Sequence, residues 1–513
     1  MKKTNLLFGT LAIAVGLLVS CKKNNSTQTT KISTPVYQVG SFITSTTLGT
    51  KNSASPTAYK GTLQANTTYS VVGDIIINVG DTILAQSGVT VCVENNSTIC
   101  VRGVLISLGT QSNPNYFTAC GVTPVDQVGT DPLTDPAYNG GAGQWTGICC
   151  DTTCTLLDLQ WTHVNYTGGI FAVNEPVNGC GSGGTSYGIL FQNPKGDLIM
   201  TDSWMYGGID DAVRIQQGRI CFMRNTFEKM GYVGGDCLNA KHGTQGVMAY
   251  NLFIGEATNG TKCSDKGSGN FVECNINMYN NTYINCGYRQ ASFSSRGSDI
   301  DYEQGGRGLC YNNLIVNCRN GIRIGNGENQ IPMPDTTNCY YGYNYIYADS
   351  DQEVDQFFPI QAGTWTRDVQ VGPYPGAYVV PTVAALGLPA NFYSPNRIAN
   401  GGDDLAYDAP SVAGKNNPMF KNFPLPEPVN GFSLAAISSI ATGKATTGSN
   451  YDFHLQTGSP AIGIGTTMGI TSAFENIPNP VTADVTNPNF APSVTGPGVD
   501  MGCYQTNGSG NQH

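Results

Sequence analysis

The stretch Asn225-Thr-Phe-Glu returns four times along the chain, as Asn251-Leu-Phe-Ile, Asn281-Thr-Tyr-Ile, Asn313-Leu-Ile-Val and Asn344-Tyr-Ile-Tyr. The intervals between these copies are 26, 30, 32 and 31 residues. Asp202-Ser-Trp-Met lies 23 residues before the first copy and reads as an earlier one. Self-similarity at a period of roughly 20–50 residues is the sequence signature of a solenoid. A solenoid confines a functional surface to one stripe along its length.

Each copy reads as a short strand with an Asn at its entrance. Helical repeats need apolar residues at a 3.6-residue period over ten or more positions, and no such stretch follows residue 21. Glycine supplies 64 of the 513 residues and charged residues only 12%, a composition that disfavours long helices with charged faces. An Asn at the same place on successive coils can form hydrogen bonds along the stack. The pattern predicts an all-β, right-handed, single-stranded parallel β-helix of about 10–12 coils.

The amino-terminal half supports the same architecture. Alternating apolar runs occur at 89–93, 99–101 and 104–108, and glycines separate them. Alternation of this kind is typical of strands with one buried face. The β-helix is therefore expected to occupy residues 59–350. The Pro-rich and Gly-rich segment 351–450 is expected to be an irregular excursion that packs on the C-terminal coils, and 451–513 to close the last coil.

The N-terminus carries a processing signal. Lys2 and Lys3 precede an apolar run, Leu6 to Leu18, that ends in Leu18-Val19-Ser20-Cys21. This ending resembles a bacterial lipobox, which implies that residues 1–20 are a lipoprotein signal peptide and that Cys21 is lipidated. Residues 21–58 are rich in Asn, Ser, Thr and Lys and are expected to form a flexible tether. These features predict a protein held by lipid in the bacterial cell envelope or outer membrane.

Sixteen cysteines remain besides Cys21, and an exported chain permits disulfides. Cys286 and Cys318 each lie five residues after a repeat Asn, so they are expected to stack on adjacent coils. Stacked side chains of parallel strands point the same way. A disulfide and a pair of free buried thiols are therefore both open at this stage.

Three further stretches carry a family resemblance: Val79-Gly80-Asp81-Thr82-Ile83-Leu84, Gln144-Trp145-Thr146-Gly147-Ile148, and Leu455-Gln456-Thr457-Gly458-Ser459-Pro460-Ala461-Ile462-Gly463. They resemble bacterial β-helix proteins of the pectate-lyase-like superfamily. The resemblance implies the fold and a polysaccharide lying across several coils. Its function stays open, because one fold hosts lyases, hydrolases, esterases and adhesins.

Aligning the strands that follow each repeat Asn places polar residues in one outward column. The strands 213–216, 238–241, 261–264, 291–294 and 322–324 fall in register, with inward columns of Val213, Leu238, Ala291 and Ile322, and of Ile215, Ala240, Phe293 and Ile324. The outward column is then Arg214, Asn239, Lys262, Ser292 and Arg323. The first four are the expected carbohydrate-binding residues.

Two catalytic interpretations use this column. In β-elimination of a uronate polymer, a base removes a proton and a cation stabilises the developing charge. Lys241 is the candidate base, Arg296 and Arg323 lie nearby, and Ca²⁺ bound by Asp210, Asp211 and Asp236 is the candidate cation. For glycosidic hydrolysis, Thr201-Asp202, Asp210-Asp211, His242-Gly243 and Arg323-Ile324 resemble polygalacturonase elements, although Lys241 and Gly325 depart from that pattern.

The balance of these observations predicts an envelope lipoprotein that binds a glycan along one face of a β-helix. A polysaccharide lyase, a glycoside hydrolase, and a structural or adhesive surface protein are the alternatives. The net charge of −10 argues against a nucleic-acid partner. No cofactor other than Ca²⁺ is indicated.

Overall fold

The computed structural model describes residues 37–94, 96–121, 145–170, 181–182, 184–231, 235–265, 273–287, 297–319, 321–324, 339–341, 343–347, 417–422, 452–467 and 494–512. Gln38–His513 forms one compact unit; of the other unit, Met1–Tyr37, only Tyr37 is described. The lipobox and Cys21 lie outside the described residues. No helix within them has the length and apolarity needed to cross a membrane.

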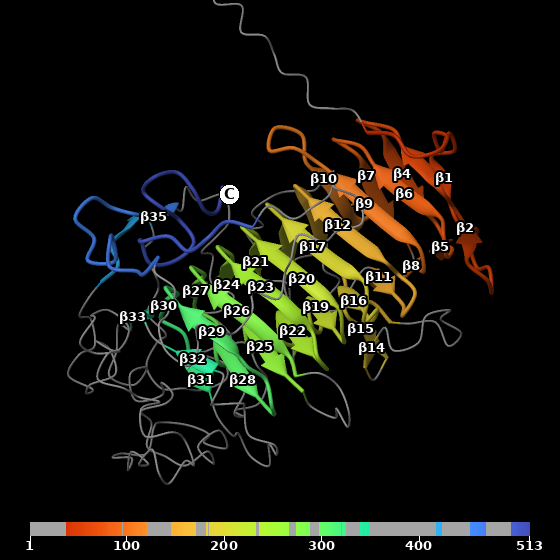
Figure 1. Ribbon diagram of the computed structural model, residues 1–513. Coiled ribbons are helices and arrows are strands. Elements are labelled where there is room, and N and C mark those ends of the chain that lie inside the picture. The colour runs from red at the N-terminus through yellow and green to blue at the C-terminus, as the bar shows by residue number, and fades with distance from the viewer. Residues whose placement is uncertain are drawn as a thin grey trace, which may run out of the picture. The chain divides into compact units, whose positions relative to one another are not determined.

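The body of the molecule is a right-handed parallel β-helix, as the repeat predicts. Three long sheets, each made only of parallel strand pairs, run along the stack (Figure 1). The chain visits them in turn, so each coil adds one strand to each sheet. We name the sheets after their first strands.

The strands of the three sheets follow in their spatial order. The β1 sheet has eleven strands: β1 (Thr47–Leu48), β4 (Thr68–Val71), β7 (Thr90–Val93), β10 (Asn115–Ala119), β13 (Thr162–Asn165), β18 (Trp204–Tyr206), β21 (Thr226–Glu228), β24 (Leu252–Ile254), β27 (Thr282–Ile284), β30 (Leu314–Val316) and β33 (Tyr345–Tyr347). The β2 sheet has ten: β2 (Thr57–Ala58), β5 (Ile75–Ile77), β8 (Thr98–Val101), β11 (Gly147–Cys150), β16 (Ile189–Phe191), β19 (Val213–Ile215), β22 (Leu238–Lys241), β25 (Thr261–Ser264), β28 (Ile300–Glu303) and β31 (Ile322–Ile324). The β3 sheet has ten: β3 (Gly61–Leu63), β6 (Thr82–Ala85), β9 (Val104–Leu108), β12 (Leu156–Gln160), β17 (Asp197–Thr201), β20 (Arg219–Met223), β23 (Gln245–Ala249), β26 (Asn275–Tyr279), β29 (Gly308–Tyr311) and β32 (Cys339–Tyr341).

Two small antiparallel pairs lie outside these sheets. One joins β14 (Gly181–Ser182) to β15 (Thr185–Ser186), and the other joins β34 (Phe420–Asn422) to β35 (Asp452–Leu455). Parallel pairing begins inside the segment that the sequence assigns to the tether, with a bridge from Phe42 to Thr62 and then strand β1 from Thr47.

Inward side chains of all three sheets form one continuous apolar core. The rings of Phe227, Phe253 and Tyr283 stack on successive coils, with centroids 5.1 and 4.7 Å apart. The inward positions expected for Val213, Leu238 and Ile322 are confirmed. The prediction that Ala291 and Phe293 continue these columns is wrong, because strand β28 pairs with β25 and its inward residues are Ile300 and Tyr302.

The repeat asparagines form a buried amide column. The Oδ1 atom of Asn281 accepts both the backbone N–H and the Nδ2–H of Asn251, each at 3.0 Å. The Nδ2 atom of Asn281 donates to the Met248 carbonyl and to Asn313 Oδ1. The same pattern joins Asn225 to Asn251 and Asn313 to Asn344. Each amide therefore fixes the register between its coil and the next.

The earlier copy of the motif is displaced by one residue from the prediction. Ser203, not Asp202, holds the position before Asn225, because the Ser203 N–H donates to Asn225 Oδ1. Asp202 instead pairs with Arg224 through two hydrogen bonds of 2.7 and 2.8 Å. The shift follows from the strand register, in which Trp204 pairs with Thr226.

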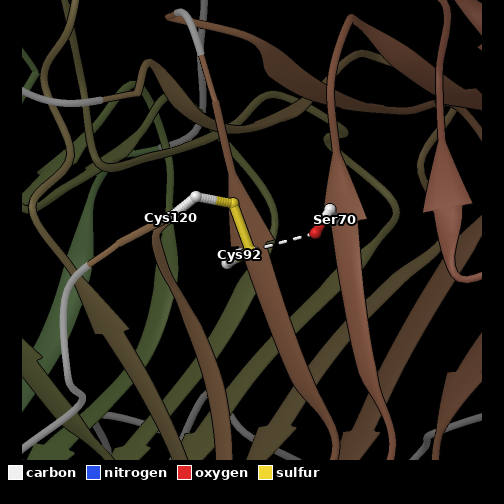
Figure 2. The surroundings of a disulfide bond; sticks show 3 residues. All are labelled: Ser70, Cys92 and Cys120. Carbon is white, nitrogen blue, oxygen red and sulfur yellow. Dashed lines mark hydrogen bonds between the residues drawn. A yellow bond between two sulfur atoms is a disulfide. The ribbon is translucent and has the colours of Figure 1, made fainter.

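The disulfide between Cys92 and Cys120 joins neighbouring coils near the N-terminal end. Figure 2 shows Cys92, on β7, bonded to Cys120, which follows β10, with Ser70 of β4 beside it. The bond closes a sequence separation of 28 residues. In the chain-entropy account, a loop of this length stabilises the folded state by roughly 3–4 kcal/mol.

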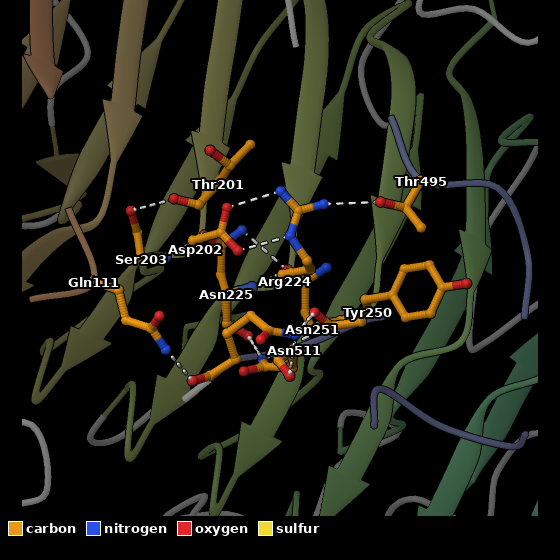
Figure 3. Close-up of polar contacts among 12 residues, drawn as sticks. Gln111, Thr201, Asp202, Ser203, Arg224, Asn225, Tyr250, Asn251, Thr495 and Asn511 are labelled. Carbon is orange, nitrogen blue, oxygen red and sulfur yellow. Dashed lines mark hydrogen bonds and ion pairs between the residues drawn. The ribbon is translucent and has the colours of Figure 1, made fainter. Parts of the chain in front are cut away.

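The described residues of 451–513 add no strand to the three parallel sheets, so the expected closing coil is not found among them. These residues pack outside the β-helix against a second apolar cluster that includes Tyr250, Tyr279 and Tyr311. Figure 3 shows Arg224 between Asp202 and Thr495, and Asn511 beside Asn225 and Asn251. Strand β35 pairs antiparallel with β34 in a separate two-stranded sheet.

We expect Asn281→Ala to lower the free energy of unfolding by about 3 kcal/mol, because two buried donors of Asn251 lose their acceptor. Denaturant unfolding of the full-length chain measures this change. Asn507 is exposed and bonds only within its own turn, so Asn507→Ala should shift stability by less than about 0.5 kcal/mol. Equal effects of the two substitutions would contradict a register-fixing role for the column.

Candidate functional site

One outward column of the β2 sheet changes its chemistry halfway along the stack. Its amino-terminal half is apolar and buried and contains Ile76, Cys100, Cys149 and Leu190. Leu190 pairs with Arg214, and from there the column reads Arg214, Asn239, Lys262, Asp301 and Arg323. The charged half crosses five coils, or roughly 19 Å at the usual spacing of parallel strands.

This column corrects the expected alignment at one coil. Asp301 holds the position predicted for Ser292, because Lys262 pairs with Asp301 in the register of β25 and β28. Ser292 and Arg296 lie outside the described residues. For Arg323, the structure places only the backbone, beside Asp301 in the β2 sheet.

Together with neighbouring carboxylates, the column forms what we call the charged cluster: Asp210, Asp211, Arg214, Asp236, Asn239, Lys241, Lys262, Asp301 and Glu303. The predicted residues Arg214, Asn239, Lys241, Lys262, Asp210, Asp211 and Asp236 all belong to it. The sequence interpretation missed Asp301 and Glu303. Their signal is the alternating stretch Ile300-Asp-Tyr-Glu, which fits a strand as well as 291–294 does.

The acidic end of the cluster is held by short contacts at the corner before β19 and β22. Asp211 accepts the backbone N–H of Asp236 at 2.6 Å, and its other oxygen lies 2.5 Å from Arg214 Nε. The Asn239 amide donates to both Asp211 and Asp236, at 3.0 and 2.8 Å. The Asp210 carboxylate accepts the N–H of Asp211 at 2.9 Å. Arg214 and Asn239 of the column thus contact the carboxylates of Asp211 and Asp236, which lie at the corners of two successive coils.

The other end of the cluster centres on Lys262. Its Nζ lies 2.6 Å from Glu303 Oε1, 3.6 Å from Asp236 and 3.8 Å from Asp301. Lys241 Nζ lies 3.9 Å from the same oxygen of Glu303. One carboxylate therefore stands between two ammonium groups, and the two lysines repel each other across it.

Burial of these charges is the main departure from the expected solvent-facing stripe. Asp301 and Glu303 are 0% and 1% exposed, and Asn239, Lys241 and Lys262 are also buried. The side chain of Arg214 is 21% exposed and lies over the ring of Tyr187, with its Cζ 4.7 Å from the centroid. Asp210 and His242 are half-buried. Arg214 and Asp210 of the cluster, together with the neighbouring His242, are therefore partly exposed, and we call these three residues the rim.

Burial also moves the protonation equilibria. It raises the pKa of Asp210 to about 7, and the charge of Asp211 adds to the rise. Burial, and then the charge of Lys262, lowers the pKa of Lys241 to about 8. Burial and the charge of Lys241 lower the pKa of His242. A basic and an acidic group thus both titrate near neutral pH, which is typical of functional sites.

The three predicted calcium ligands do not converge on one point. Asp211 binds Arg214 and Asn239, whereas Asp236 also accepts Thr258 Oγ1 and Asn259 Nδ2. Among the described residues, one set of three possible ligand atoms lies within 4.8 Å of one another, and it is elsewhere. Protein donors therefore occupy the carboxylates that were expected to bind Ca²⁺.

The hydrolase interpretation needs Asp202 beside Asp210 and Asp211. Asp202 lies in the turn between β17 and β18, at the corner of the β3 and β1 sheets, and pairs with Arg224. Asp210 and Asp211 lie between β18 and β19, at the next corner. The structure therefore assigns these carboxylates to two separate surroundings.

Comparisons with known proteins do not assign the chain to a family. The chain matches no protein-family model, and comparison with curated proteins and with solved structures gives no match. Functional assignment therefore depends on the geometry of the charged cluster.

We expect the substitution Asp210→Asn to change the pH dependence of stability. With its pKa raised, folded Asp210 holds a proton that the unfolded chain has released, so its contribution to stability is lost as pH rises from about 4 to about 7. Across this window, the free energy of unfolding of the variant should rise by about 2 kcal/mol relative to that of the wild type. This value is discounted because Asp210 is partly exposed. Denaturant unfolding at a series of pH values measures the difference. The neutral neighbour variant Gln216→Ala should show a constant offset, and a constant offset for Asp210→Asn would contradict the shift.

Proposed function

We propose that this protein is an envelope lipoprotein that binds a carbohydrate chain across the outward face of the β2 sheet, at the rim formed by Arg214, Asp210 and His242. The observation that carries the proposal is the column itself, in which cationic, amide and carboxylate side chains follow one another over five adjacent coils. Burying so many charges is costly, and a purely structural face has no need of them.

The mixture of charges favours a hydroxyl-rich ligand. A sugar hydroxyl both donates and accepts hydrogen bonds, so it can bridge a carboxylate and a neighbouring cation. At the rim, the Asp210 carboxylate is an acceptor and the Arg214 guanidinium is a donor. The buried contacts of Asp211 with Arg214 and Asn239 hold this rim in place. The site is thereby preorganised, which lowers the entropic cost of binding.

The membrane anchor rests on the lipobox, and the disulfide between Cys92 and Cys120 supports export. Cys21 as the lipidated residue remains a prediction.

Binding can be tested by calorimetric titration of the full-length chain, in detergent, with a panel of neutral and uronic-acid oligosaccharides. At least one oligosaccharide should bind, and Arg214→Gln should weaken it about 10-fold or more, since a hydrogen bond to a charged group contributes about 1.5–3 kcal/mol. Lys60 is an exposed cation that follows β2, the terminal strand of this sheet, so Lys60→Gln is the matched control and should bind as the wild type does. The absence of binding, or an unchanged affinity for Arg214→Gln, would contradict the proposal.

A second candidate function, β-elimination of a uronate polymer, is favoured by the Lys241 ammonium. Its pKa of about 8 leaves part of the population neutral near physiological pH, as a general base requires. The lysine would take the proton α to the uronate carboxylate, and Arg214 would stabilise the charge that develops. The glycosidic oxygen would then leave, forming an unsaturated uronate.

Ultraviolet absorbance of the unsaturated product tests this second function, with uronate polymers as substrates. The rate should rise toward pH 8 and fall about 100-fold or more in Lys241→Met, because general-base catalysis contributes about that much. Lys195→Met replaces an exposed lysine and should leave the rate unchanged. If oligosaccharides bind but no polymer gives a signal, the protein binds carbohydrate without cleaving it.

A further inference from the structure

A second cluster of reactive side chains lies inside the β-helix, away from the carbohydrate rim. It occupies the corner where the chain passes from the β1 sheet to the β2 sheet. Cys286 follows β27, Cys318 follows β30 on the next coil, and Asp299 directly precedes β28. All three side chains are fully buried. Their ligand atoms, two sulfurs and one carboxylate oxygen, lie within 4.8 Å of one another.

The stacking of the two cysteines follows from the strand register. Ile284 pairs with Val316, so the residues two positions later, Cys286 and Cys318, also face each other. The backbone N–H of Cys286 lies 3.4 Å from the Cys318 sulfur. Both thiols are free in the structure. The sequence left a disulfide and free thiols open, and the structure has free thiols.

The Asp299 carboxyl group is the anomaly in this corner. Both of its oxygens are buried, and neither accepts a hydrogen bond of ordinary geometry. The thiol of Cys318 is the polar side-chain group that lies against it. A buried carboxyl group whose side-chain neighbour is a weakly polar thiol is costly, and such a group calls for a specific explanation. A cation bound between the carboxylate and the two sulfurs would supply one.

Neighbouring residues complete the surroundings of a cation. Glu256 lies on the preceding coil, where its carbonyl accepts the N–H of Gly287, and the thiol of Cys237 lies against its carboxyl group. The charges of Glu256 and Cys237 both interact with Cys286, so these two residues are the candidates for a fourth ligand. The buried side chain of Arg319 packs against Gly287 and Gly297, which flank the corner in sequence. Its positive charge can balance the excess negative charge of two thiolates and a carboxylate around a divalent ion.

We propose that Cys286, Cys318 and Asp299 bind one divalent, thiophilic metal ion of the zinc class inside the β-helix, with Glu256 or Cys237 as the fourth ligand. Two thiolates and a carboxylate are a donor set that selects such metals over Ca²⁺ or Mg²⁺. In a tetrahedral zinc site, the two sulfurs lie about 3.8 Å apart, within the observed limit. The ion would link two successive coils at one corner.

Binding must release protons, because a metal is ligated by the thiolate and both thiols are free in the structure. The metal displaces one proton from each sulfur, forming two metal–sulfur bonds, and both protons pass to solvent. Affinity should therefore fall as pH falls. A structural role follows from the closed, buried position, which leaves no place for a substrate.

Metal analysis of the full-length protein tests the proposal. The chain is unfolded with a chelator, refolded with or without Zn²⁺, and analysed by mass spectrometry for metal and by thiol titration. We expect about one ion per chain to be retained after desalting, together with a higher thermal midpoint than the metal-free sample. Refolding with Co²⁺ should give the intense charge-transfer absorption of thiolate ligation, a readout that needs no variant.

Variants then locate the ion. Cys318→Ser and the milder Asp299→Asn should each lose the retained metal and the gain in thermal midpoint. Cys221 is another buried free thiol, on β20, so Cys221→Ser should retain both. A metal-free protein in which peptide mapping finds a Cys286–Cys318 disulfide would overturn the proposal. Metal-free protein with all of these thiols reduced, or retention of metal by Cys318→Ser, would overturn it equally.

Discussion

Register between coils is the constraint on which the rest of the structure depends. Parallel strands supply backbone hydrogen bonds at any register, so the buried amides of Asn225, Asn251, Asn281 and Asn313 select one. Each amide binds the next coil through both its side chain and its backbone. A slip of one residue would leave several buried donors and acceptors unpaired and would turn the apolar columns outward.

The charged cluster depends on the same register. Arg214, Asn239, Lys262 and Asp301 come from four coils and lie in one column only because their strands pair without a shift. Their contacts then couple the coils electrostatically, in addition to the backbone ladder. The cost of burying these charges is offset by mutual pairing, and removal of one partner would leave another charge isolated. Burial moves the protonation equilibria of Asp210 and Lys241 in opposite directions toward neutrality, and the opposite charges around each group limit the shift.

Two corners of the same stack hold different chemistry. On the outside, lysines and carboxylates pair across β22, β25 and β28, and the donor set suits sugar hydroxyls. On the inside, Cys286, Cys318 and Asp299 meet among apolar side chains, where a carboxyl group lacks ordinary partners. The C-terminal segment covers a third region, at Tyr250 and Tyr279, and protects the tyrosine hydroxyls with backbone acceptors. The solenoid thus separates these chemical surroundings by face as well as by coil.

The sequence by itself determined the fold class, the repeat and most of the outward column, because periodic strands and ladder residues are local properties of the chain. It also predicted the stacking of Cys286 on Cys318. Tertiary structure decided which strand follows β25. The number of residues between successive repeat strands varies, so the repeat period does not locate the strand that begins at Ile300. It also decided that the column is buried, that Asp211 and Asp236 bind protein donors, and that residues 494–512 pack outside the coils. These outcomes depend on contacts between residues far apart in the chain, for which a single sequence contains no local signal.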